Sequence, residues 1–245
     1  MIPLSRPPWK GLGKKIESQC RKALYDYGML EGANKIAVAL SGGKDSLTLL
    51  YMLKGILGRG FPDAEIHAIH VDGEYTCGAG VNLDYLRAIC RELEINFITR
   101  KSTQTLDSLE CYSCSRERRK LLFDAAKSVG ACTVAFGHHR DDNAQTLMMN
   151  LLQKGEFAGM LPKLYMQHYG CNIIRPLVYV PENEIREFAR QTGFARITCQ
   201  CPVGQNSKRK QVDVLLDEMD ALYPHARHNL ASASLKYGSD KAKNP

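Results

Sequence analysis

The sequence lacks any long hydrophobic run. Its longest uninterrupted aliphatic stretch, Ile36–Leu40, has five residues, whereas a membrane-spanning helix needs about 20. The segment before Trp9 contains the adjacent prolines Pro7 and Pro8 and no apolar core, which is not the pattern of a secretory signal. Because 44% of the 245 residues are hydrophobic, the composition is that of an ordinary globular chain. We therefore expect a cytoplasmic protein with no membrane partner.

The sequence also lacks the even cysteine count of a secreted disulfide framework, since it has nine cysteines. In a reducing compartment, clustered cysteines more often bind metal or perform chemistry. Four of the nine lie among apolar residues and are expected to be buried small hydrophobes, namely Cys20, Cys90, Cys132 and Cys171. Acidic residues are in a minority, with 26 Asp and Glu against 33 Lys and Arg. The resulting charge of +7 suits a polyanionic partner such as nucleic acid without requiring one.

Short apolar segments alternate with helical patterns of 10–15 residues, which predicts a parallel α/β sheet flanked by helices. The expected strands are residues 35–40, 65–71, 95–100, 131–136 and 172–174. The expected helices are residues 13–30, 46–57, 81–93, 115–129, 141–152, 182–191 and 208–222. In this division, residues 1–12 are a flexible arm, residues 13–222 a single catalytic domain with a cysteine-bearing helical insert, and residues 223–245 a frayed tail. Since parallel sheets bind ligands beyond the carboxyl ends of their strands, the residues after strands one, two and four should face one cleft.

A phosphate-binding loop is predicted directly after the first strand, at Ser41-Gly42-Gly43-Lys44-Asp45-Ser46. Adjacent glycines let the backbone approach a ligand, and the helix that follows offers free N–H groups to an anion. The common mononucleotide loop, Gly-Lys-[Ser/Thr], is absent because Asp45 follows Lys44. A tight turn capped by Asp45 or Ser46 would explain two glycines alone, but the whole hexapeptide favours phosphate binding.

A second polar segment, Gly137-His138-His139-Arg140-Asp141-Asp142, follows the fourth strand. Five consecutive ionisable residues are costly at such a place unless they are solvated or used. The two carboxylates could cap the next helix, hold Mg²⁺ against ATP phosphates or act as a base. Asp72, at the end of the second strand, either faces the same cleft or fills an ordinary Asp-Gly turn.

The motif Cys111-Tyr112-Ser113-Cys114 begins a predicted helix, where the dipole and nearby arginines stabilise thiolates. Three interpretations compete: a thiol–disulfide pair, half of a zinc site, and part of an iron–sulfur cluster. A thioredoxin-like motif would follow the first strand of its own βαβ unit, and a structural zinc would need a second C-x-x-C. Cys199 or Cys201 would add a third thiolate, which leaves one iron of a four-iron cluster open to hold sulfide. Surface thiols without a function are the remaining alternative.

The loop Ser41–Ser46 resembles the pyrophosphate loop of the N-type ATP pyrophosphatases, the PP-loop enzymes. These enzymes cleave ATP to AMP and pyrophosphate, and they usually adenylate a carbonyl oxygen of the substrate. The resemblance implies a Rossmann-like fold of the adenine nucleotide alpha hydrolase type, with Ser41–Ser46 gripping pyrophosphate and Asp72 near the adenosine. The segment Gly137–Asp142 resembles the Gly-His-x-x-Asp-Asp motif of PP-loop tRNA-modifying enzymes. That resemblance implies that Gly137 and His138 bind ATP and that Asp141 and Asp142 activate nucleotide or substrate.

The resemblance becomes more specific over residues 10 to 225, where five motifs occur in one order. These are Cys111-x-x-Cys114-Ser115-Arg116, Gly137–Asp142, Gly159-Met160-x-Pro162-Lys163, Ile174–Leu177, and Cys201 before Asn206-x-x-Arg209. Together they resemble the tRNA 2-thiocytidine synthetase (TtcA) family. The family implies ATP, Mg²⁺ and a [4Fe-4S] cluster held by Cys111, Cys114 and Cys201, and a tRNA whose anticodon-loop cytidine is 2-thiolated. Cys199 stands one residue out of register for the family's extra cysteine, so the choice of third ligand between Cys199 and Cys201 stays open.

On this hypothesis, the C2 carbonyl oxygen of cytosine attacks the α-phosphate of ATP, and sulfide then displaces AMP. The sulfur donor would be a cysteine desulfurase or free sulfide, and homodimers are common in the family. Basic clusters flank the cysteines, so we expect a tRNA-binding rim at Arg116, Arg119, Lys208 and Arg209, although either cluster alone would be explained as a solvated helix face. The alternatives are a PP-loop enzyme that thiolates another tRNA base, a persulfide on Cys201 without a cluster, an adenylating ligase, and a nucleotide- or zinc-binding regulator.

Overall fold

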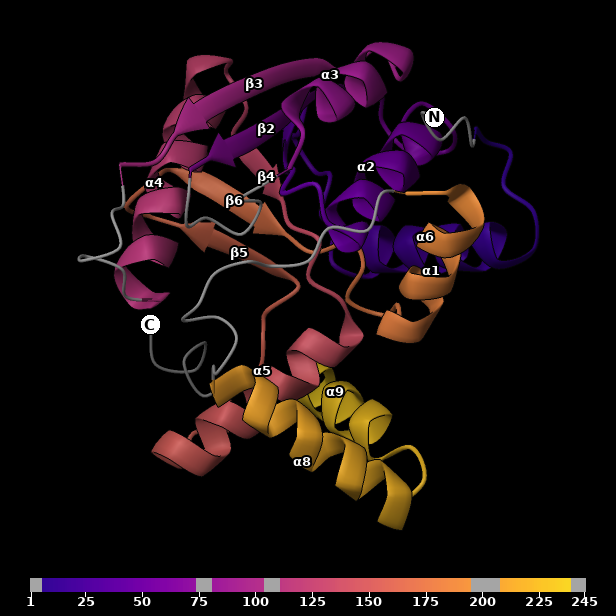
Figure 1. The fold of residues 1–245 in the computed structure, drawn as a ribbon, viewed down its shortest axis with the longest axis vertical. Coiled ribbons are helices and arrows are strands. Elements are labelled where there is room, and N and C mark those ends of the chain that lie inside the picture. Colours follow the sequence, from indigo (N-terminus) through magenta and orange to yellow (C-terminus); the bar gives the residue numbers. More distant parts are fainter. Residues whose placement is uncertain (1–5, 74–80, 104–110, 195–207, 239–245) are drawn as a thin grey trace.

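The computed structural model describes residues 6–73, 81–103, 111–194 and 208–238, with residues 111–114 described by their backbone alone (Figure 1). The helices are α1 (Gly11–Asp26), α2 (Lys44–Ile56), α3 (Leu83–Glu92), α4 (Cys111–Ser128), α5 (Arg140–Lys154), α6 (Glu182–Thr192), α8 (Lys208–Leu222) and α9 (Ala226–Tyr237). The strands are β1 (Lys35–Ala39), β2 (Glu65–Asp72), β3 (Asn96–Lys101), β4 (Thr133–Ala135), β5 (Lys163–Met166) and β6 (Cys171–Ile174).

The strands form one six-stranded sheet in the order β3-β2-β1-β4-β6-β5. Every neighbouring pair is parallel except β5 and β6, which form an antiparallel hairpin at the edge. The predicted parallel α/β fold is therefore confirmed, and β5 is the strand that the sequence pattern missed. The order in which the strands are added to the sheet reverses between β1 and β4, and the crevice at such a switch point is where open α/β sheets bind ligands.

The sheet is covered on both faces, which explains the uninterrupted apolar character of its central strand. Ile36 and Val38 of β1 pack into the cluster formed with α1, α2, α3 and α6. Ala37, which points to the opposite face because side chains alternate along a strand, packs with Phe123 of α4. In Figure 1, α1, α2 and α6 lie on one side of the sheet and α4 on the other.

Helices α5, α8 and α9 pack together below the sheet as a three-helix lobe (Figure 1). Its core is made of Ala144, Met148, Val212, Leu216 and Ala231. The prediction of a frayed tail is therefore wrong for residues 226–237, which form α9. This helix has little sequence signal because it docks through small side chains rather than through a stripe of large apolar ones. Ala231 is buried, and so is Ser234, which donates to Asn143 Oδ1 of α5 at 3.3 Å.

The expected flexible arm is also wrong at its carboxyl end. Trp9 is buried, with its ring edge-on to Phe188 of α6 at a centroid distance of 5.6 Å, and α1 already begins at Gly11. A single large aromatic side chain is enough to hold this segment against the domain. Of the four cysteines predicted to be buried, Cys132 is exposed and the other three are buried. None of the helices in the described parts of the chain has both the length and the hydropathy of a membrane span.

Because Leu216 is 0% exposed in the core of the lobe, Leu216→Ala should lower the free energy of unfolding by about 2–5 kcal/mol. The matched control lies on the same helix: Leu222 is 75% exposed, so Leu222→Ala should change it by no more than about 0.5 kcal/mol. Denaturant unfolding followed by circular dichroism measures both. Equal effects of the two substitutions would contradict the docking of α8 described above.

Candidate nucleotide and catalytic site

A cavity of about 310 Å³ opens at the switch point, beyond the carboxyl ends of β1 and β4. It is lined by Ala39, Leu40, Ser41, Asp45, Ser46, Ile69, Val71, Arg118, Arg119, Leu122, Phe136, Gly137, His138, Asp142 and Arg209. The loops after the first and fourth strands thus face one cleft, as expected. The volume is within the range typical of small-molecule sites.

The loop Ser41–Ser46 is held in shape by its own serines. Ser46 Oγ accepts from Gly42 N at 3.1 Å and donates to Gly43 O at 3.0 Å, and Ser41 Oγ lies 3.2 Å from it. Gly42 has a φ of +86°, a conformation that favours glycine. Gly43 is the N-cap of α2 and has no side chain with which to cap it, so the free N–H groups of the first turn stay available to an anion. This arrangement fits a phosphate ligand.

Lys44 is held by carboxylates on both sides. Its Nζ lies 3.1 Å from Asp45 Oδ1 and 3.0 Å from Glu182 Oε1 of α6. Burial would lower the pKa of Lys44, but the two carboxylates outweigh it and raise that pKa, so the side chain is charged at neutral pH. Burial raises the pKa of Asp45, although His139 and Lys44 oppose it. Sequence reasoning did not identify Glu182, since nothing local links it to the loop.

Gly137 explains why the segment after β4 begins with glycine. A Cβ at this position would lie 3.0 Å from the backbone C and O atoms of Asp45 and 3.1 Å from Ser46 N. Such contacts are tighter than nine in ten real Cβ contacts, and the opposing atoms are backbone, which cannot easily shift to relieve them. The absence of a side chain thus lets the β4–α5 loop touch the start of α2.

The first turn of α5 fixes Asp142 in the cavity. His139 is the N-cap, and its Nδ1 accepts from Asp142 N at 3.4 Å while its backbone N donates to Asp142 Oδ2 at 3.0 Å, which is a capping box. The second oxygen, Oδ1, pairs with Arg209 Nη1 of α8 at 2.8 Å. Burial would raise the pKa of Asp142, but His139, His138 and Arg209 together hold it below its usual value. The group is therefore a carboxylate at neutral pH.

Asp141, its neighbour, faces away from the cavity lining. Its Oδ2 accepts from Glu182 N at 2.7 Å, which caps α6, whose own N-cap Pro181 has no side-chain hydrogen bond. Its Oδ1 lies 3.7 Å from Arg227 Nε of α9. The side chain is buried. The two aspartates, which the sequence alone could not tell apart, thus occupy different environments.

His138 lines the cavity and is hydrogen-bonded to Arg175, which is not among the lining residues. Arg175 Nε donates to His138 Nδ1 at 3.3 Å, and its Nη1 donates to Leu161 O. Burial lowers the pKa of His138 to about 3; Asp142 opposes this shift, and Arg175 and Arg209 add to it. His138 is therefore neutral at physiological pH and acts through hydrogen bonding rather than charge. Burial likewise lowers the pKa of Arg175 to about 10.

Two segments that adjoin the predicted cysteine ligands meet at this cavity. Arg118 and Arg119 reach it from α4, whose first turn contains Cys111 and Cys114, and Arg209 reaches it from the first turn of α8. The side chains of Cys111 and Cys114, and Cys201 with Cys199 altogether, lie outside the described residues. Among the residues that are described, no group of three or more His, Cys, Asp or Glu is arranged for a metal ion.

The remaining predicted site residues surround the cavity rather than line it. Asp72 ends β2, where its Oδ1 accepts from Gly73 N at 2.9 Å, as in the Asp-Gly turn considered above. Arg116 and Lys208 are exposed. Arg118 lines the cavity and was not among the site residues selected from the sequence. The five consecutive charged residues 116–120 gave no pattern to show which of them faces the sheet.

Comparisons with known proteins agree with this geometry. A model of the PP-loop domain family matches residues 12–201. A tRNA-cytidine(32) 2-sulfurtransferase from Geobacter sulfurreducens is 34% identical over 230 residues, which are 90% of this chain and 88% of that protein. The enzyme of that name from Bordetella pertussis is 37% identical over 228 residues, 91% of this chain and 71% of its own length. The chain belongs to the tRNA-cytidine(32) 2-sulfurtransferase family of PP-loop proteins.

A solved structure supports the same family relation. The U34-tRNA thiolase NcsA from Methanococcus maripaludis, described with its [4Fe-4S] cluster, has a TM-score of 0.74 and 26% sequence identity to this chain. The match covers 91% of this chain and 78% of that one. The resemblance to PP-loop tRNA-thiolating enzymes inferred from the motifs is thus confirmed.

The pKa of His138 leads to a test of the site in solution. An unfolded histidine titrates near 6.5, so between about pH 7 and pH 5 the unfolded state takes up a proton that the folded state does not. The free energy of unfolding must therefore decrease as the pH is lowered from 7 to 5, and His138 alone should account for about 2 kcal/mol of that decrease. The variant His138→Gln should show a correspondingly shallower loss when denaturant unfolding is measured at both pH values. Parallel losses in the two proteins would mean that His138 is protonated in the folded state.

Proposed function

We propose that this chain is an ATP-dependent tRNA sulfurtransferase that 2-thiolates cytidine 32 in the anticodon loop. One observation carries the proposal: the PP-loop, Asp142 and the arginines of the helix that bears Cys111 and Cys114 line a single cavity. The target base follows the name shared by the curated family members. Cytoplasmic location is part of the same proposal, because tRNA is the substrate.

The nucleotide would lie across the switch point. Ser41–Ser46 and the first turn of α2 would bind the pyrophosphate part, with Lys44 exchanging its carboxylate partners for phosphate oxygens. Asp142 is the carboxylate in the cavity and would hold Mg²⁺ against the phosphates. His138, being neutral, would donate a hydrogen bond to an oxygen of the α-phosphate. The C2 carbonyl oxygen of the cytosine would attack that phosphate, form an adenylated base and release pyrophosphate.

The second half of the reaction needs sulfur. Arg118 follows Cys114 by four residues, about 6 Å along a helix, and Lys208 follows Cys201 by seven residues. Arg118 lines the cavity, and Lys208 is next to Arg209, which also lines it; the three thiols supply the number of protein ligands that a [4Fe-4S] cluster with one open iron requires. When bound, such a cluster would supply the sulfide that displaces AMP. The sulfur itself would come from a cysteine desulfurase or from free sulfide.

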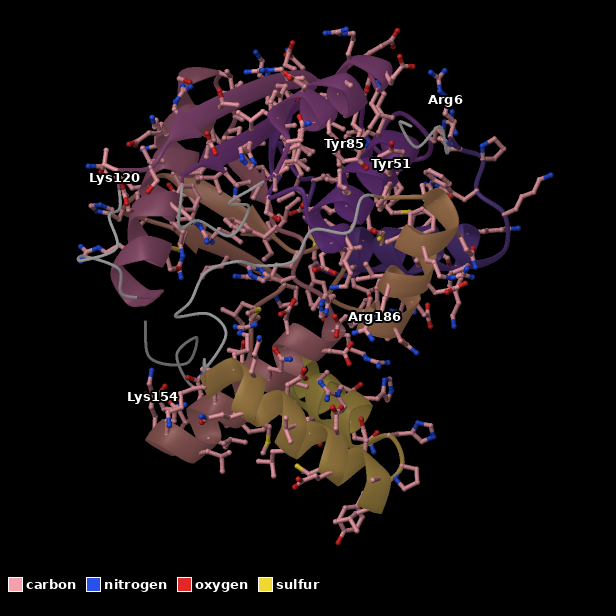
Figure 2. All side chains as sticks on the ribbon, viewed as in Figure 1. Arg6, Tyr51, Tyr85, Lys120, Lys154 and Arg186 are labelled. Atoms are coloured by element: carbon pink, nitrogen blue, oxygen red, sulfur yellow. The ribbon has the colours of Figure 1, made fainter. Side chains whose placement is uncertain are left out.

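The tRNA would approach over the exposed basic residues at the rim. Arg116 and Arg119 on α4 and Lys208 on α8 are exposed, and Figure 2 shows the neighbouring Lys120 on the outer side of α4. Contacts of this kind neutralise phosphates and position the RNA without reading its sequence. A homodimer is the assembly that we expect from the family.

Cysteine substitutions test the cluster. Cys111→Ala, Cys114→Ala and Cys201→Ala should each abolish 2-thiocytidine formation and the iron–sulfur absorbance of protein purified without oxygen. The matched control is Cys132→Ala, since Cys132 is exposed at the start of β4 and should be dispensable. Nucleoside analysis of tRNA and an assay of about four irons per chain give the readouts. Three active alanine variants would refute the cluster, and thiolation of U34 in place of C32 would refute the proposed base.

Substitutions of the two aspartates should have different main effects, on AMP formation for Asp142 and on stability for Asp141. Asp142→Asn should lower AMP formation at least about 100-fold, because it removes the charge in the cavity. Asp141→Asn should instead lower the free energy of unfolding by about 1–3 kcal/mol, because Arg227 loses a buried charged partner. Rapid-quench assays with labelled ATP and thermal unfolding measure the two effects. The reverse pattern would reassign the roles.

A further inference from the structure

Arg209 was expected to bind tRNA, but its guanidinium is engaged by side chains of α5, while its side chain is 41% exposed. Nη1 lies 2.8 Å from Asp142 Oδ1 and 3.5 Å from Gln145 Oε1, and Nη2 lies 3.5 Å from Thr146 Oγ1. All three acceptors are on consecutive turns of α5. The residues on either side, Lys208 and Lys210, are more exposed than Arg209.

The partners of Arg209 are themselves fixed by a chain of contacts. Gln145 Nε2 donates to Asp213 Oδ1 at 2.8 Å, and Asp213 Oδ1 also accepts from Arg227 Nη1 at 2.6 Å. Arg227, in the first turn of α9, is buried and reaches back to Asp141 of α5. The polar contacts thus run from Asp142 through α8 and α9 and return to the neighbouring aspartate.

We propose that Arg209 is a positioning residue for Asp142, held in place by Gln145, Asp213 and Arg227. This inference rests on the proposed function only in assigning catalysis to Asp142. Arg209 lies beyond residues 12–201, so the three-helix lobe would complete a site whose phosphate loop belongs to the PP-loop domain. A carboxylate with one oxygen held by a backbone N–H and the other by an arginine has its plane fixed, which metal and phosphate binding require.

The test is a double-mutant cycle between Arg209→Gln and Asp142→Asn, with Arg209→Lys as a second variant that keeps the charge. The readouts are kcat and KM for ATP in tRNA-dependent AMP formation, and the salt dependence of tRNA binding. Arg190→Gln is the matched control, because Arg190 is an exposed arginine of α6 whose ion pair is with Glu187.

We expect Arg209→Gln to lower kcat about 10–100-fold and Arg209→Lys to lower it less. In a protein that already contains Asp142→Asn, Arg209→Gln should cause no further loss of kcat. The dissociation constant for tRNA and its salt slope should match those of the unchanged protein. Additive losses would overturn the proposal, and so would a salt slope reduced by about one, which marks a lost phosphate contact. A wild-type protein that forms AMP but no 2-thiocytidine would refute the proposed product. The double-mutant cycle would still test the role of Arg209, because its readout is AMP formation.

Discussion

The site depends on one close approach, between the backbone of Gly137 and the first turn of α2. A side chain at residue 137 would meet the carbonyl group of Asp45 at 3.0 Å, so any larger residue would push the loop after β4 away from the phosphate loop. The two loops follow strands that are neighbours in the sheet, and glycine lets them touch. Because of that contact, the hydroxyls of the phosphate loop and the carboxylate of Asp142 line the same small volume.

The lysine and the catalytic carboxylate of the site each have partners of opposite charge within the protein. Lys44 is paired with Asp45 and Glu182, and Asp142 with Arg209. Buried charges without partners would be expensive, so the protein supplies counter-ions of its own. A phosphate ligand competes with Glu182 and Asp45 for Lys44, and a metal competes with Arg209 for Asp142. The affinity for nucleotide therefore depends on the free energy of the ion pairs formed with the ligand minus that of the ion pairs broken within the protein.

Much of this architecture could be predicted from the sequence. The phosphate loop, the fourth-strand motif and the parallel sheet follow from short apolar runs ended by glycine and polar residues, which are local signals. The roles of Asp141 and Asp142 could not be separated in this way. Adjacent residues on a helix point about 100° apart, so the starting residue of α5 decides which of them faces the cavity, and the capping box of His139 sets that start.

Other features were missed for a related reason. β5 is a four-residue edge strand and α9 docks through Ala231 and Ser234, so neither gives a strong periodic pattern. Trp9 is a single anchoring side chain in a segment whose prolines suggest a loose arm. The contact between Arg209 and Asp142 joins residues 67 positions apart. Such pairings are products of tertiary packing, and no window along the chain contains them.

Gln145 has a further consequence for the network in which it lies. Its side-chain oxygen accepts from Arg209 and its nitrogen donates to Asp213, so one neutral amide joins two groups of opposite charge. A carboxylate at this position would repel Asp213, and a cation would repel Arg209. The amide therefore couples the geometry of the cavity to the ion pairs of the helical lobe without adding a charge of its own to either.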